Sequence, residues 1–210
     1  MSTQKYFDYH FLELQDHDNF FVNKSNKNAF NTINSSNLNQ FIYLHGPKKS
    51  GKSHLLNIWK QNNDAINFKN NISQILKLKQ NVCIDNFDNN FSEEEIFHII
   101  NHCNSYNLKI LITSLFELNN LNIYLHDLSS RLKAFYYVNI DYPDEEMCKI
   151  LLTKLFYEKQ IIIKNKEIFD YIFNRINRTY NDIFLIVKKL DKLSLQKKRQ
   201  LTIPLIKEIL

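Results

Sequence analysis

The stretch Phe41-Ile-Tyr-Leu-His45-Gly46-Pro-Lys-Lys-Ser-Gly51-Lys52-Ser53 decides the fold. Its first five residues form a short apolar run rich in β-forming residues, and its last eight fit the pattern G-x-x-x-x-G-K-[S/T]. A segment with Leu55, Leu56 and Trp59 at helical spacing follows at once. A strand before the motif and a helix after it are the context in which this motif binds phosphate. The alternative is an ordinary strand-to-helix turn, which does not require these residues.

The residue types of this loop suit a nucleoside di- or triphosphate. Glycines let the backbone amides turn towards the phosphates, Lys52 reaches the β- and γ-oxygens, and Ser53 can ligate Mg²⁺. The chain has two glycines in all, and both occupy the positions where the loop requires them. The predicted nucleotide-binding residues are Phe21, Val22, Gly46, Pro47, Lys48, Lys49, Ser50, Gly51, Lys52, Ser53 and His54.

Strand and helix patterns alternate on both sides of the loop. Apolar runs predict further strands at 65–68, 82–85, 109–113 and 136–140. Periodic segments predict helices at 25–33, 72–79, 92–104 and 126–134. Such alternation favours right-handed crossovers and a parallel five-stranded sheet with helices on both faces. The pattern becomes wholly helical after Pro143, with later helices expected at 166–176, 180–195 and 203–210. We therefore expect a lead at 1–17, an α/β domain at 18–141 and a small helical domain at 142–210.

Composition narrows the class of protein. A hydrophobic content of 44% is ample for a packed core, and neither a membrane-spanning run nor a signal peptide is evident, so we expect a cytosolic protein without a membrane partner. Three widely spaced cysteines, Cys83, Cys103 and Cys148, favour reduced core residues over a metal site or a disulfide.

The net charge of +5 permits contact with DNA or acidic proteins. Basic residues gather towards the C-terminus, and they suit either a solvated helix face, the commoner case, or a nucleic-acid patch. They are Lys188, Lys189, Lys192, Lys197, Lys198 and Arg199.

Val82-Cys-Ile-Asp85 is a short apolar strand that ends in a carboxylate. Together with the upstream loop, this pattern is typical of the acid that holds Mg²⁺ through water beside the phosphates. The predicted metal-binding pair is therefore Ser53 and Asp85. A surface acid at a strand end is the alternative.

Several segments resemble one family, the DnaA-related AAA+ proteins of the Hda type. The loop and helix start Gly51-Lys-Ser-His-Leu-Leu56 are similar to those of DnaA and its relatives, and Val82-Cys-Ile-Asp-Asn86 resembles the Hda form of the acidic strand. Asp127-Leu-Ser-Ser-Arg-Leu132 resembles the family's Box VII segment, and residues 199–210 resemble the Hda C-terminus. The resemblance covers residues 18–210 and implies an AAA+ P-loop domain followed by a helical lid.

The resemblance assigns roles to single residues. AAA+ ATPases place a second acid after the first to orient the attacking water, and here that residue is Asn86, an amide that cannot accept a proton; Asp88 lies too far along. The strand ending at Thr113-Ser114 would carry a polar sensor of the γ-phosphate, and Ser114 is the predicted one, unless these hydroxyls simply end the strand. Arg131 matches the Box VII arginine, which reaches a neighbouring subunit's γ-phosphate, unless it forms a surface salt bridge.

Two further features follow from the same resemblance. The lid position of the second-sensor arginine falls on Asn181, with Arg178 one turn earlier as the alternative. Hda proteins open with a short peptide that docks in the sliding clamp, and its counterpart here would be Gln4, Phe7 and Tyr9, although Lys5 and Tyr6 depart from the common pattern.

The resemblance therefore implies regulatory inactivation of the replication initiator. The protein would hold ADP or ATP with Mg²⁺, bind the DNA polymerase III sliding clamp, contact DNA indirectly through it, and stimulate hydrolysis of DnaA-bound ATP while turning over little nucleotide itself. It would work in the bacterial cytoplasm at the nucleoid, and a homodimer is compatible with the role. The alternative is a self-sufficient ATPase of the same fold, such as a helicase loader on single-stranded DNA; Asn86 counts against it.

Overall fold

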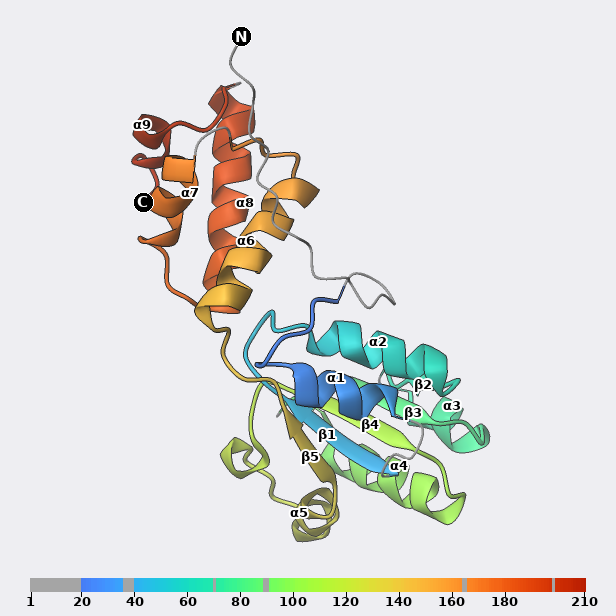
Figure 1. Ribbon diagram of the computed structural model, residues 1–210. Coiled ribbons are helices and arrows are strands. Elements are labelled where there is room, and N and C mark those ends of the chain that lie inside the picture. Colours follow the sequence, from blue (N-terminus) through green and yellow to red (C-terminus); the bar gives the residue numbers. More distant parts are fainter. Residues whose placement is uncertain (1–19, 36–39, 70, 89–90, 164–165, 198) are drawn as a thin grey trace.

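The computed structural model describes residues 20–35, 40–69, 71–88, 91–163, 166–197 and 199–210. An α/β unit is followed by a helical unit that stands over the end of the sheet where the chain leaves β5 (Figure 1). The architecture expected from the sequence, a parallel five-stranded sheet followed by a small helical unit, is confirmed. No helix in the described ranges is both long and apolar enough to cross a bilayer.

Five strands form one sheet in the order β2-β3-β4-β1-β5, and all neighbouring strands are parallel. They are β1 (Phe41–His45), β2 (Ile66–Asn67), β3 (Val82–Phe87), β4 (Ile110–Ser114) and β5 (Tyr136–Asn139). All five lie where the apolar runs predicted them. The first strand pairs with β4 on one side and β5 on the other, so the loop that follows it emerges from the middle of the sheet.

Helices cover both faces of the sheet because successive strand residues point to opposite sides. On one face Ile42 and Leu44 pack with α1 (Lys27–Asn34) and α2 (Lys52–Asn62). On the other face Tyr43 packs with α4 (Glu93–Ser105) and α5 (His126–Lys133). Helix α3 (Ile72–Lys77) adds Ile75 to the second cluster. The 3₁₀ turn η1 (Leu118–Asn120) was not predicted.

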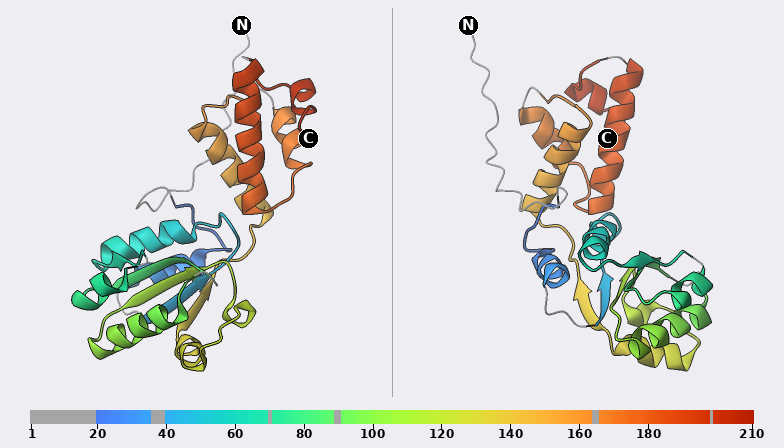
Figure 2. Two further views of the ribbon diagram at one scale, coloured as in Figure 1. Left: turned by 180° about the vertical axis from the view of Figure 1, so that it is seen from behind. Right: turned by 90° about the vertical axis from the view of Figure 1, so that its right-hand side faces the viewer.

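The lid has a core of its own. Figure 2 shows its helices from two further directions. It comprises α6 (Glu145–Glu158), α7 (Lys166–Phe173), α8 (Tyr180–Lys197) and α9 (Ile203–Ile206). The prediction of a helix over 203–210 is wrong in its length. Bonds from Glu208 N to Leu205 O and from Ile209 N to Ile206 O span three residues, so the chain tightens into turns after Ile206.

Two lid residues belong to the core of the α/β unit. Met147 of α6 and Tyr180 of α8 lie in the cluster that contains α1 and α2, whereas the other buried lid residues pack among themselves. The last strand ends at Asn139 and the first helix of the lid begins at Glu145. The α/β unit and the lid are therefore joined by buried apolar contacts as well as by the connecting chain.

Candidate nucleotide site

The phosphate loop leads from β1 into α2, as the motif predicted. Gly46 and Gly51 both have positive φ, and Gly51, at φ 96°, is the N-terminal cap of α2. A side chain at Gly46 would meet Ile140 O at 2.8 Å, and one at Gly51 would meet the Phe20 ring at 2.6 Å. Both positions therefore require glycine for space, and Gly51 also for its left-handed backbone.

The N-terminus of α2 has the features of an anion site. No side chain caps it, and its first turn contains no acidic residue. Its amides are free to receive an anion. The buried Ser50 Oγ just before it and the buried His54 Nε2 in its first turn have no hydrogen-bond partner within the described part of the chain. Unpaired buried polar atoms around an uncapped helix start fit a phosphate-bearing ligand, which would satisfy them.

Lys52 lies inside the loop, with only 5% of its surface exposed. Its ammonium group donates to Gly46 O and Pro47 O, each at 2.8 Å. Burial lowers the pKa of Lys52 to about 8, and the nearby Asp85 carboxylate opposes that shift. The side chain is thus held at the loop with a charge that is easier to lose than that of a surface lysine.

The predicted metal-binding pair meets across the site. Ser53 Oγ donates to Asp85 Oδ1 at 3.1 Å, so the hydroxyl and carboxylate that would hold Mg²⁺ lie side by side. Among the described residues no group of three or more histidine, cysteine or acidic side chains forms a metal cluster. A hydroxyl and one carboxylate fit Mg²⁺, which keeps several waters and takes its other ligands from phosphate.

The end of β4 supplies a different hydroxyl from the one predicted. Thr113 Oγ1 donates to Asp85 Oδ1 at 2.6 Å and accepts from Asn86 N at 3.0 Å. Ser114 is fully buried on the other face of the sheet, where its hydroxyl donates to Phe87 O and accepts from Phe116 N. Thr113, the hydroxyl of this pair that the sequence analysis did not choose, contacts Asp85, and we infer that it is the polar group of this strand at the candidate site.

Asn86 is exposed beside Asp85, with a φ of 56°. The pairing of β3 with β4 shifts register between Ile84 and Phe87, which is a β-bulge. Asparagine tolerates this left-handed backbone better than most residues do. The bulge turns Asn86 out of the regular strand. This is the position at which AAA+ ATPases have their second acid.

Ahead of α1, Phe20 lies against the loop, with its ring edge-on to His54 and stacked on Phe30. Phe21 and Val22 follow it, half-buried and packed on the same core cluster. From the other side Lys49, whose φ is 66°, places its ammonium group 5.6 Å from the ring centre of Phe184 in α8. The loop therefore lies between residues 20–22, ahead of α1, and helix α8 of the lid.

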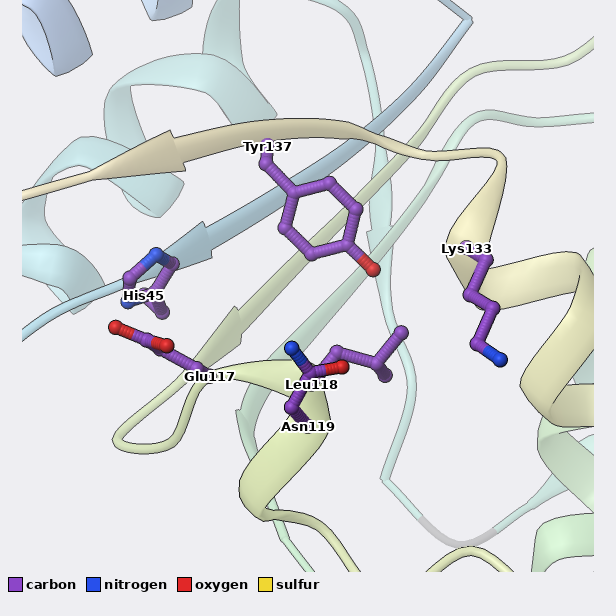
Figure 3. A pocket seen from close by; sticks show the side chains of 6 residues that line it. All are labelled: His45, Glu117, Leu118, Asn119, Lys133 and Tyr137. Carbon is purple, nitrogen blue, oxygen red and sulfur yellow. The ribbon is translucent and has the colours of Figure 1, made fainter.

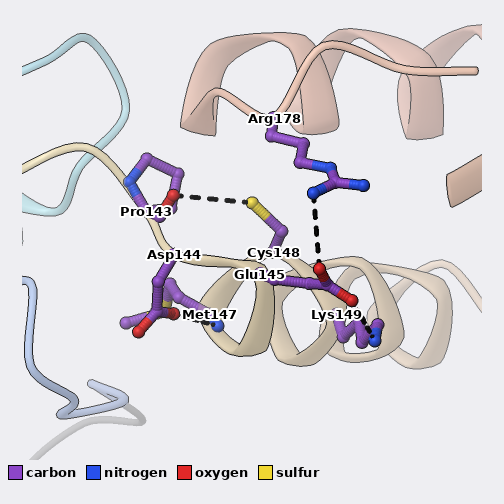
Figure 4. Close-up of polar contacts among 7 residues, drawn as sticks. All are labelled: Pro143, Asp144, Glu145, Met147, Cys148, Lys149 and Arg178. Carbon is purple, nitrogen blue, oxygen red and sulfur yellow. Dashed lines mark hydrogen bonds and ion pairs between the residues drawn. The ribbon is translucent and has the colours of Figure 1, made fainter. Parts of the chain in front are cut away.

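The two alternative lid sensors differ in their contacts. Arg178 bonds to Glu145 at 3.3 Å, at the start of α6 (Figure 4). Its guanidinium also lies 5.2 Å from the centre of the Phe173 ring. Glu145 also pairs with Lys149, and these partners lower its pKa. Asn181 is half-buried in the first turn of α8. Arg178 is thus held on the lid's own surface.

A hydrogen-bond network connects Asn23 and Ser25, just before α1, to the lid. Asp144 Oδ1 caps α6 by accepting from Met147 N at 2.8 Å, and the same oxygen accepts from Asn23 Nδ2 at 3.0 Å. Ser25 Oγ donates to Asn23 Oδ1 at 2.6 Å and lies 2.9 Å from the Tyr180 hydroxyl. The single proton of Ser25 is used on Asn23, so Tyr180 is the donor to Ser25.

A separate open pocket of about 260 Å³ lies at the end of β1 on the α5 side of the sheet (Figure 3). His45 and Glu117 face each other at one end of it, and Tyr137 and Lys133 lie towards the other end. Burial lowers the pKa of His45, and Glu117 opposes that shift. The pocket contains none of the predicted nucleotide-binding residues.

The remaining predicted residues lie elsewhere. Arg131 is exposed in the last turn of α5 and forms no ion pair with any described residue. Gln4, Phe7 and Tyr9 lie outside the described residues. The three cysteines are buried and free, as expected, and burial raises their pKa values.

A phosphate loop between β1 and α2, a parallel sheet in this strand order and a helical C-terminal unit define an AAA+ protein. Comparison with known proteins narrows the class, because the family model described as "Hda, lid domain" matches residues 144–210. An uncharacterised Haemophilus influenzae protein is 31% identical in a gapped alignment of 199 positions that covers 84% of this chain and 84% of that protein. The chain belongs to the Hda-type family of DnaA-related AAA+ proteins.

Two DnaA proteins are similar to this chain. The chromosomal replication initiator DnaA of Buchnera aphidicola is 27% identical in a gapped alignment of 226 positions that covers 91% of this chain and 51% of the initiator. The chain thus spans about half of that relative's length. The AMPPCP-bound structure of DnaA from Aquifex aeolicus has the same fold, with a TM-score of 0.65, 19% identity and coverage of 85% of this chain and 66% of that one.

Proposed function

We propose that this protein holds ADP or ATP with Mg²⁺ and, bound to the DNA-loaded sliding clamp, supplies Arg131 to DnaA and stimulates hydrolysis of DnaA-bound ATP. The observation that carries the proposal is the contrast between two sites. Its own phosphate loop is complete, but the residue that follows Asp85 in β3 is an amide, Asn86. Arg131, by comparison, is exposed without an ion-pair partner among the described residues.

The chemistry supports an arginine in this role. A guanidinium is permanently charged and planar, so it can neutralise charge that develops on a transferred phosphoryl group and contact two of its oxygens at once. Such a finger contributes about 10³–10⁵ in rate in P-loop enzymes. At the last turn of α5, the side chain extends from a fixed helix into solvent and can reach a neighbouring molecule.

The nucleotide assignment is supported independently. Ser50 Oγ and His54 Nε2 are buried and unpaired around the uncapped start of α2, and Ser53 already contacts Asp85. The similar DnaA of Aquifex aeolicus is AMPPCP-bound. We therefore place the phosphates at the loop, the metal between Ser53 and Asp85, and the base beside Phe21 and Val22.

The test is DnaA ATP hydrolysis with clamp-loaded DNA, with and without this protein. Arg131→Ala should remove at least about nine-tenths of the stimulation, and Arg131→Lys should restore little of it, because an ammonium group lacks the planar fork. Lys133→Ala is the matched control, since it removes one positive charge from the same helix turn. Its stimulation should stay within about twofold of wild type.

Two outcomes would contradict the proposal. An Arg131→Ala protein that stimulates DnaA as well as the wild type does would exclude Arg131 as the finger. Rapid turnover by the purified protein alone would favour the second candidate, a self-sufficient ATPase such as a helicase loader. Removing residues 1–9 tests Gln4, Phe7 and Tyr9 in a direct measurement of clamp binding, which should be lost. Undiminished clamp binding would exclude these residues.

A further inference from the structure

The net charge of the chain belongs entirely to its C-terminal third. Residues 1–143 contain thirteen basic and thirteen acidic residues, whereas residues 144–210 contain fourteen basic and nine acidic. The +5 of the whole chain is thus the charge of the lid segment. An uneven distribution of this kind produces a local positive potential that the overall charge understates.

Several lid acids are already paired with particular cations. The ion pairs are Glu145 with Lys149 and Arg178, Glu158 with Lys154, Asp191 with Lys159, and Glu208 with Lys197. No lysine from the middle of α8 takes part in them. Lys188, Lys189 and Lys192, here called the α8 basic stripe, therefore have no ion-pair partner within the described ranges.

The geometry of α8 brings these lysines together on its outer side. The helix has 18 residues and buries Ile183, Val187 and Leu190 in the lid core, and it is seen lengthwise in the left view of Figure 2. All three lysines of the stripe are exposed. Residues three and four apart lie on one helix face, so Lys188 and Lys189 stand one turn before Lys192. The stripe lies between two exposed leucines, Leu185 and Leu195.

We propose that the α8 basic stripe binds the phosphate backbone of duplex DNA. When closely spaced lysines without acidic partners neutralise phosphates, they displace the counterions condensed on the DNA. This counterion release drives sequence-independent binding. Single strands are bound through aromatic platforms on which bases stack, and the exposed residues of α8 include no aromatic side chain. A stiff helix with ammonium groups along one side fits the regular backbone of a duplex instead.

This contact is independent of Arg131 and of the clamp. It goes beyond the proposed function, in which DNA is reached only through the clamp. If the lid binds the duplex directly, the protein contacts the same DNA through two separate parts. The contact can be measured on the purified protein without either partner, so its failure would leave the proposed function untouched.

The experiment measures fluorescence anisotropy of a short labelled duplex from about 50 mM to about 200 mM salt. The test variant is Lys188→Glu, Lys189→Glu and Lys192→Glu together. The matched control reverses three other exposed lysines, Lys27, Lys69 and Lys77, so both variants have the same net charge. Loss of three phosphate contacts should reduce the slope of log affinity against log salt by about 2.7, and affinity at the lowest salt should fall at least about tenfold. The control should change by less than about threefold.

Far-ultraviolet circular dichroism and ADP binding verify that both variants remain folded. The triple Lys→Gln variant, which removes charge without reversing it, should reduce the salt slope by the same amount. Three results would overturn the proposal: no duplex binding by the wild type at low salt, equal weakening in the test and control variants, or tighter binding of a single strand than of the duplex. A stripe that served an acidic protein would leave duplex affinity unchanged in the test variant.

Discussion

Lys52 is the buried lysine of the phosphate loop, and its pKa of about 8 lies below the 10.5 of an ordinary lysine. The amine is charged below pH 8 and becomes neutral as the pH rises through that value. Nucleotide phosphates are already fully ionised there, since their last pKa lies near about 6. Any loss of affinity above pH 8 therefore reports the lysine.

We predict that ADP affinity, measured by isothermal titration calorimetry, falls about tenfold per pH unit once the pH exceeds about 8. Binding should take up a proton in this range, because phosphate favours the charged amine. Lys52→Arg keeps its charge throughout and should show no such decline, and Lys52→Ala should abolish binding. A wild-type affinity that stays constant from pH 7 to about pH 9.5 would contradict the buried charge.

Asn86 is the second residue whose chemistry can be changed in place. Aspartate has nearly the same shape and also tolerates the left-handed backbone, so Asn86→Asp should preserve the bulge while adding a carboxylate beside Asp85. A positioned base contributes about 10²–10⁴ in rate. We predict that this variant hydrolyses ATP at least about tenfold faster than the wild type, as measured by phosphate release. The variant Asn86→Ala should show no gain, and equal rates for all three proteins would mean that something other than the base is missing.

At the scale of elements, the contact between α8 and the segment before α1 holds the lid against the sheet domain. Tyr180 is 3% exposed, and its hydroxyl is the donor to Ser25 Oγ. Burial raises its pKa, so the hydroxyl keeps its proton at neutral pH. The bond joins positions 155 residues apart and therefore fixes tertiary rather than local structure.

Tyr180→Phe should lower the free energy of unfolding by about 1 kcal/mol, because Ser25 loses a buried donor while the ring stays packed. Urea denaturation measures this change. Tyr157→Phe provides the control, since Tyr157 in α6 is 82% exposed and its hydroxyl faces water. The control should stay within about 0.5 kcal/mol of wild type. Equal stability of Tyr180→Phe and the control would show that the bond contributes nothing.

The elements could be predicted because their signals are local. Each strand is a short apolar run between turn residues, and the loop motif needs only its own eight residues to be recognised. The sequence patterns did not predict the features that depend on the register between paired strands. Thr113 and Ser114 are neighbours with similar chemistry, and the pairing of β4 with its neighbours decides which one faces Asp85. The bulge at Asp85 and Asn86 adjusts that pairing, and no short pattern reports it.

At the scale of the whole molecule, the missed features are those built from distant segments. The pocket around Tyr137 draws on β1, β5, α5 and the segment after β4, and Arg178 pairs with Glu145 at a separation of 33 residues. Neither arrangement follows from spacing along the chain. The charge of the lid was visible in the sequence, but only the ion pairs show which lysines remain unpaired with acids.

The shared carboxylate of Asp144 has a consequence for exchanging parts between relatives. One of its oxygens binds Met147 N in the lid and Asn23 Nδ2 in the α/β unit, and Tyr180 reaches Ser25 beside that asparagine. A chimera joined at Asp144 would separate these partners, even though the sequence match to the lid family begins there. The unit of exchange is therefore discontinuous: a transplanted lid must bring the tripeptide Asn23–Ser25 from its own parent.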